Sequence, residues 1–154
     1  MTPTLTHIIR YPVKGLPGEP LAQASLVAGG GIEHDRRFAI ENGAQAALDG
    51  GGWAPCQHFT RLTIDPRLVR HQVRYDASQR VLSISIDGGV GARAQLDDPV
   101  QRVGLDAFLT SQFALRPRQV ARLTECDAPN AYWDVQDAPL SLLNLSSVAA
   151  TSIA

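Results

Sequence analysis

Features that mark membrane-spanning, secreted or nucleic-acid-binding proteins are scarce in this sequence. No apolar run reaches the roughly 18–20 residues that cross a bilayer, and the first residues lack the basic and apolar regions of a signal peptide. The net charge is −1, so nothing in the charge balance suggests a nucleic-acid or membrane surface. The two cysteines, Cys56 and Cys126, form neither a CxxC motif nor a Cys/His cluster with zinc spacing. We therefore expect a cytoplasmic protein with two separate thiols, and neither a membrane nor a nucleic-acid partner.

Lysine is also nearly absent. The chain has 14 lysine and arginine residues, and Lys14 is the single lysine among them. Such an exception can reflect a need for a compact ammonium on a flexible stem, which acts as a point charge toward phosphate. The alternatives are chance at one position and an ordinary solvated loop lysine.

The hydrophobic pattern is mostly that of strands. Short alternating or apolar segments recur between glycine- and proline-rich turns. The clearest pair, residues 69–75 and 81–86, predicts a hairpin across a polar turn. The predicted strands cover residues 5–11, 21–27, 36–41, 69–75, 81–86, 92–96, 118–123 and 140–145. Residues 42–52 are expected to form a hairpin loop, and Ser146 is expected to begin a further helix.

One helix is well delimited. Asp98 can cap it, Pro99 occupies the first helical position, and Gln101 completes a capping-box spacing. Pro117 ends the pattern. Gly104 within the helix costs roughly 1 kcal/mol against alanine, which suggests a close packing contact there. The apolar face is expected to run from the N-terminal turn to Phe113 through these residues: Val100, Val103, Ala107, Phe108 and Leu109.

These elements predict a mostly β fold, a β-barrel with one α-helix and α+β character at its margins. No β-α-β alternation is present, so no dinucleotide-binding crevice is expected. The glycine cluster at 29–31 matches neither the GxGxxG nor the GxxxxGK[ST] phosphate motif. Hydrolytic motifs such as GxSxG and HExxH are missing too.

Two segments contain candidate binding residues. Lys14 follows a strand that Pro12 ends, in a turn where Gly15 lets backbone N–H groups approach a ligand. Arg36 and Arg37 stand where a glycine-rich loop re-enters a strand, so one side chain points inward and its neighbour outward. The alternative is an exposed arginine beside one that pairs with Asp35 or Glu33.

Together the two segments resemble the N-terminal β-barrel of MOSC-family proteins. The first reads Tyr11-Pro12-Val13-Lys14-Gly15, and the second reads Gly31-Ile32-Glu33-His34-Asp35-Arg36-Arg37-Phe38. Looser similarity extends over nearly the whole chain and includes Trp133-Asp134-Val135. On this resemblance, residues 1–125 form the MOSC N-terminal β-barrel domain, and residues 126–154 form a linker and the truncated start of a MOSC domain.

The resemblance implies a function. The family includes the mitochondrial amidoxime-reducing component and its bacterial relatives, which bind a molybdenum cofactor (molybdopterin) between this barrel and the MOSC domain that follows. Carried over residue by residue, it implies cofactor contacts for Lys14, Gly15 and Arg36, and it places Asp134 near the cofactor. An ammonium, a guanidinium and exposed N–H groups suit the acceptors of a pterin phosphate.

Two departures from the family pattern limit what this chain is expected to do. Many members have serine after the lysine, whereas Gly15 offers only its backbone N–H. The metal-ligating cysteine of the family belongs to the later MOSC domain, so neither Cys56 nor Cys126 is expected to ligate metal. We therefore expect the chain to hold part of a cofactor site and to be inactive alone, with the C-terminal MOSC domain and an electron-transfer protein as partners.

Two other functions remain open from the residues alone. The same Lys14/Arg36 pair would also serve a stand-alone β-barrel module that binds another small anionic ligand. A structural or interaction domain without any ligand is the third reading.

Overall fold

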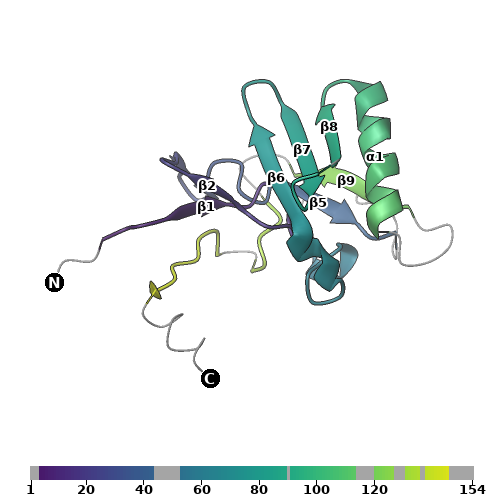
Figure 1. The fold of residues 1–154 in the computed structure, drawn as a ribbon. Helices are drawn as coiled ribbons and strands as arrows, with labels where there is room; N and C mark the ends of the chain where they lie inside the picture. Colours follow the sequence, from purple (N-terminus) through teal and green to yellow (C-terminus); the bar gives the residue numbers. More distant parts are fainter. Residues whose placement is uncertain are drawn as a thin grey trace.

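The computed structural model describes residues 4–43, 53–89, 91–113, 120–126, 131–135 and 138–145. These residues form nine strands, two short 3-10 helices and one α-helix (Figure 1). The elements are β1 (Ile8–Arg10), β2 (Glu19–Leu21), β3 (Leu26–Val27), β4 (Gly31–Ile32), β5 (Phe38–Glu41), η1 (Cys56–His58), η2 (Pro66–Arg70), β6 (His71–Asp76), β7 (Val81–Ile86), β8 (Gly91–Gln95), α1 (Pro99–Phe113) and β9 (Arg122–Glu125). No helix among the described residues is long and apolar enough to cross a membrane.

The strands pair into four small antiparallel sheets. The largest has the order β6-β7-β8, and α1 packs beside β8 (Figure 1). β5 pairs with β9, while β1–β2 and β3–β4 form two-stranded ribbons. The predicted fold class is confirmed: the chain is mostly β with one helix. Within the described ranges, the sheets do not close on one another.

The predicted hairpin is β6–β7, in the register that the sequence pattern requires. His71 pairs with Ile86 and Asp76 with Val81. The Asp76 carboxylate accepts the backbone N–H groups of Ser78 and Gln79 at 3.0 and 3.1 Å, so it closes the turn as an Asx motif does.

Four predicted strands differ most from the observed ones. The strand predicted at 118–123 is observed as β9 at 122–125, and residues 120 and 121 lie outside it. The strand predicted at 5–11 is shorter in the structure and forms only β1. The strand predicted at 21–27 is replaced by two strands, β2 and β3. The division follows from pairing, because β2 bonds to β1 and β3 bonds to β4, so the chain must turn between them. The predicted strand at 140–145 is wrong. These residues make no ladder within the described part of the chain, and Leu142 and Leu143 are 89% and 78% exposed.

The helix begins as predicted, and the face that it buries was predicted in part. Asp98 accepts hydrogen bonds from the N–H groups of Val100 and Gln101 at 2.9 and 3.2 Å. The predicted apolar face is confirmed in its second half, where Leu109 and Phe113 are buried and Phe108 packs against the core. Its first half is wrong, because Val100 and Val103 are 79% and 69% exposed. The buried residues follow the i, i+4, i+8 spacing of a single helical stripe: Leu105, Leu109 and Phe113.

The predicted close contact at Gly104 is also wrong. A Cβ at this position would meet no atom within 4 Å. Gly104→Ala is therefore expected to raise the free energy of unfolding by about 1 kcal/mol, because alanine restricts the unfolded chain and favours the helix. Urea unfolding followed by circular dichroism measures this change. A loss of stability would show that the glycine serves a contact after all.

The predictions for residues 44–52, 118–119 and 146 onward lie outside the described residues. The main core lies between the three-stranded sheet, α1 and β5. Phe38 is fully buried there, with its ring edge-on to Tyr75 at a centroid distance of 5.0 Å. This residue begins β5, so the core fixes the strand beside which the candidate site is built.

Candidate functional site

Lys14 is held in place by the start of β5. Val13 forms a parallel bridge with Phe38, the Lys14 N–H donates to the Phe38 carbonyl at 2.8 Å, and the Phe38 N–H donates to the Pro12 carbonyl at 3.0 Å. Pro12 itself cannot donate to a ladder, which explains why the segment joins β5 through isolated bonds. The side chain of Lys14 is only 4% exposed, so the reading of an ordinary solvated lysine is wrong.

The Lys14 ammonium reaches a segment far along the chain. Its Nζ donates to the carbonyls of Tyr132 and Trp133 at 2.9 and 3.1 Å and to the Asp134 carboxylate at 2.8 Å. An ammonium has three N–H donors. Three acceptors thus satisfy the buried charge, as a buried ion requires.

Arg36 lies next to this cluster. Its backbone is left-handed, with a φ of 49°, and its N–H donates to the Tyr11 carbonyl at 2.6 Å. The guanidinium lies over the Tyr11 ring, 5.0 Å from the centroid, and bonds through Nη1 to the buried Asp35 carboxylate at 2.5 Å. Asp35 also accepts the Tyr11 N–H at 2.7 Å, so one carboxylate orients both neighbours.

Asp134 connects the two cations. One carboxylate oxygen accepts from Lys14, and the other lies 3.7 Å from Arg36 Nη2. Partial burial works to raise the pKa of Asp134, but the hydrogen bond from Lys14 and the charges of Lys14 and Arg36 together hold it below its ordinary value. The structure therefore brings Lys14, Arg36 and Asp134 into one cluster.

Gly15 is next to this cluster in the chain, and its backbone explains the residue type. Its φ is 83°, and a Cβ would stand 2.5 Å from the Thr60 carbonyl oxygen. Glycine is the residue that fits here without strain. Among the described residues, the Gly15 N–H has no hydrogen-bond acceptor.

Arg37 points away from the cluster. Its Nε donates to Glu125 at 2.7 Å, and Arg80 binds the same carboxylate at 3.1 and 3.2 Å. Burial works to raise the pKa of Glu125, but the two arginines lower it overall. Arg36 and Arg37 are 21% and 20% exposed, so they differ in partner rather than in burial. The expected inward and outward alternation is therefore not seen in their burial, and the two arginines are distinguished by their carboxylate partners.

Sequence reasoning missed the acceptors that complete the cluster. Tyr132 and Trp133 contribute backbone carbonyls, which carry no side-chain signature. The Tyr132 N–H also donates to the Arg36 carbonyl at 2.9 Å, and Trp53 Nε1 donates to the Trp133 carbonyl at 3.0 Å. The motif residue Asp35 was considered only as a partner for arginine, whereas it also fixes Tyr11.

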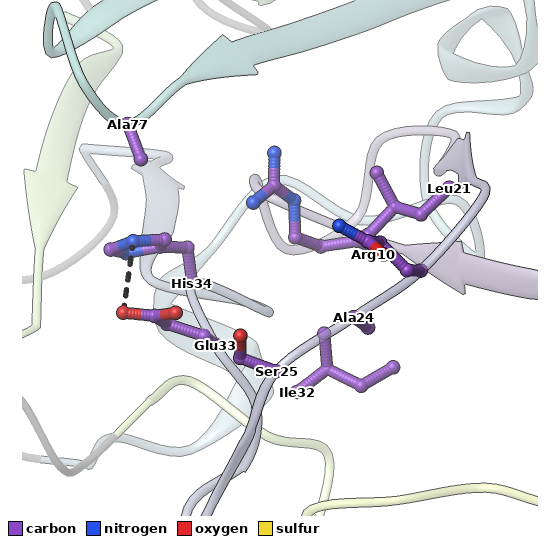
Figure 2. Close-up of a pocket in the computed structure, with 9 residues that line it drawn as sticks. Arg10, Leu21, Ala24, Ser25, Ile32, Glu33, His34 and Ala77 are labelled. Carbon is purple, nitrogen blue, oxygen red and sulfur yellow. Dashed lines mark ion pairs between the residues drawn. The ribbon is translucent and has the colours of Figure 1, made fainter.

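A separate cavity lies between the β1–β2 and β3–β4 ribbons and the turn of the β6–β7 hairpin (Figure 2). Its volume is about 460 Å³, and its ionisable lining residues are Arg10, Glu33 and His34. Arg10 is already paired with Glu19 at 2.6 Å. Burial lowers the pKa of His34, with a smaller opposing effect of Glu33. Because Glu33 adds an exposed carboxylate, this cavity does not suit an anion.

The cysteines lie in different surroundings. Cys126 is buried, and Cys56 is exposed, with Arg61 Nη1 at 3.1 Å from its sulfur. Among the described residues, no group of three or more histidines, cysteines, aspartates or glutamates is placed to hold a metal ion.

The family model of the MOSC N-terminal beta barrel domain matches residues 2–126. The chain belongs to this family. The match includes both motif segments, with Lys14, Gly15 and Arg36, and it ends before Asp134. Comparison with curated proteins and with solved structures gave no match.

Proposed function

We propose that this MOSC N-terminal domain is the cofactor-recognition part of a molybdenum-cofactor protein of the reductase or sulfur-transfer type. Lys14, Gly15 and Arg36 bind the phosphate and pterin of the cofactor, and Asp134 lies beside them. When bound, the cofactor supplies the redox-active metal. The metal-ligating cysteine and the contact with an electron-transfer partner belong to a C-terminal MOSC domain.

One observation supports this proposal most directly: the family motif brings together two cations and a backbone N–H that has no acceptor among the described residues. The Arg36 guanidinium has five N–H donors. Among the described residues, one of its hydrogen bonds goes to Asp35, so donors remain for a phosphate oxygen. Arginine and backbone N–H groups are the usual donors to phosphate in proteins.

The residues present fit the cofactor by donor type. A further donor, the indole Nε1–H of the buried Trp133, has no acceptor among the described residues. It lies in the residue before Asp134, within the segment that Lys14 binds. A pterin is rich in acceptor atoms, so a cluster with surplus N–H donors is chemically suited to it.

The alternative function, a stand-alone module that binds another small anion, would use the same two cations, Lys14 and Arg36. The separate cavity gives it no support, because Arg10 is neutralised there by Glu19 and the lining adds Glu33. We therefore place anion recognition at Lys14 and Arg36.

Arg36→Gln is expected to lower the cofactor content of the full-length protein at least tenfold. The change removes a charge-assisted hydrogen bond, typically about 1.5–3 kcal/mol, and about 1.4 kcal/mol corresponds to a factor of ten. The protein is purified from cells that make the cofactor. Its molybdenum is measured by mass spectrometry, and its pterin by fluorescence after oxidation.

Arg37→Gln is the matched control. It makes the same chemical change in the adjacent residue at nearly equal exposure, but this arginine binds Glu125 instead. We expect wild-type cofactor content from this variant. Equal cofactor content in both variants and the wild type would refute the site assignment.

A further inference from the structure

The anion site is electrically balanced without any ligand. Lys14 and Arg36 provide two positive charges, and Asp35 and Asp134 provide two negative ones at 2.5–3.7 Å. The three donors of the Lys14 ammonium are all engaged. An added phosphate would therefore meet neither a net positive charge nor a free donor on Lys14.

The acceptors of Lys14 differ in how firmly they are held. The Tyr132 side chain is fully buried, and its N–H is bonded to the Arg36 carbonyl. The Trp133 carbonyl also accepts from Trp53. Asp134, in contrast, is 70% exposed, and its carboxylate contacts no described group besides Lys14 and Arg36. Only this acceptor can leave without breaking other bonds.

Asp134 also stands where a bridging oxyanion would stand. Its two oxygens face the two cations separately, at 2.8 Å from Lys14 Nζ and 3.7 Å from Arg36 Nη2. A phosphate bridges two cations in the same manner, with a different oxygen toward each.

We propose that Asp134 determines the specificity of this site: its carboxylate occupies the position of the ligand's phosphate, and a ligand binds by displacing it. The inference rests on the proposed function. Displacement frees one Lys14 donor and leaves a net charge of +1 on the remaining three groups. A phosphate monoester dianion exploits both changes, whereas a simple carboxylate only replaces one carboxylate with another. The site therefore selects phosphate-bearing ligands against carboxylates.

Removal of Asp134 tests the proposal in the chain as it stands. Asp134→Ala is expected to bind inorganic phosphate about tenfold more tightly than the wild type, measured by NMR titration of the Tyr132 and Trp133 amides. Asp87→Ala is the control, because Asp87 is another exposed aspartate paired with an arginine, at a different place. Its phosphate affinity should equal that of the wild type. Asp134→Asn, which keeps the shape but not the charge, should fall between the wild type and Asp134→Ala.

Acetate gives an independent readout. It should fill the vacated position in Asp134→Ala and raise its melting temperature, because a ligand that binds only the folded state stabilises it. Acetate should not raise the melting temperatures of the wild type or Asp87→Ala in this way. The melting temperature without added anion also establishes that each variant is folded.

An unchanged or weaker phosphate affinity in Asp134→Ala would overturn the proposal, as would acetate effects equal in all variants. These outcomes are separate from those for the proposed function. If Arg36→Gln loses cofactor as expected but Asp134→Ala binds phosphate no more tightly than the wild type, only the displacement of Asp134 is refuted. If Asp134→Ala binds phosphate tenfold more tightly but Arg36→Gln keeps its cofactor content, only the proposed function is refuted.

Discussion

Lys14→Met is expected to lower the free energy of unfolding by about 3 kcal/mol, and to lower the melting temperature by roughly 6–12 °C. Methionine preserves length and apolar volume but donates no hydrogen bond. The buried Tyr132 carbonyl then loses its Lys14 donor, and Asp134 loses its nearest cation. Leaving buried acceptors without donors costs about 1–3 kcal/mol each. Differential scanning calorimetry and urea unfolding measure the loss.

Arg70→Met is the control for the loss of a cation. Arg70 pairs with Asp87, but both side chains are more than half exposed. An exposed ion pair contributes about 0–1 kcal/mol, so this variant should remain close to the wild type. Hydrogen exchange adds a local measure, since only Lys14→Met should increase exchange in residues 131–135. Equal effects of the two substitutions would show that Lys14 does not hold that segment.

Gly15→Ala is expected to lower the free energy of unfolding by about 2–4 kcal/mol. Two causes contribute, and a matched variant separates them. An alanine with a φ of 83° carries the cost of left-handed backbone, about 1–2 kcal/mol. Its Cβ must also move away from the Thr60 carbonyl, which would lie 2.5 Å away. The shift displaces the turn that holds Lys14, so phosphate affinity should fall together with stability. Urea unfolding and the same amide titration measure both effects.

Gly29→Ala isolates the backbone cause. Its φ is 71°, but a Cβ there meets no atom within 4 Å. The free energy of unfolding of this variant should fall by about 1–2 kcal/mol, and its phosphate affinity should stay unchanged. If Gly15→Ala were no worse than Gly29→Ala, the contact with Thr60 would be unimportant.

The local pattern predicted the hairpin and the helix start because their determinants lie within a few residues. The strand alternation sets the β6–β7 register, and Asp98 caps α1 through its own neighbours. The buried helix face was predicted only in its second half, at Leu109 and Phe113. Val100 and Val103 form as apolar a stripe as Leu105 and Leu109, and the position of the sheet decides which stripe is covered.

The candidate site was predicted only through its side chains. The motifs indicated Lys14 and Arg36 because charge and residue type are visible in a sequence. The carbonyls of Tyr132 and Trp133 are not visible in this way, since every residue has one. The sequence resemblance placed Asp134 near the cofactor, but its bond to Lys14 depends on how the segment at 131–135 packs beside Lys14 and Arg36.

The bonds from Lys14 to Tyr132, Trp133 and Asp134 also bear on how the molecule forms. They join groups separated by 118–120 positions, whereas β6, β7, β8 and α1 follow one another along the chain. Closing a long loop costs more entropy than closing a short one, and native contacts of high sequence separation slow folding. On the ribosome, Lys14 emerges well before its acceptors at 132–134, so its bonds cannot form until about 120 further residues have been made. The ion cluster is thus completed only after the sequence-local sheet and helix have emerged.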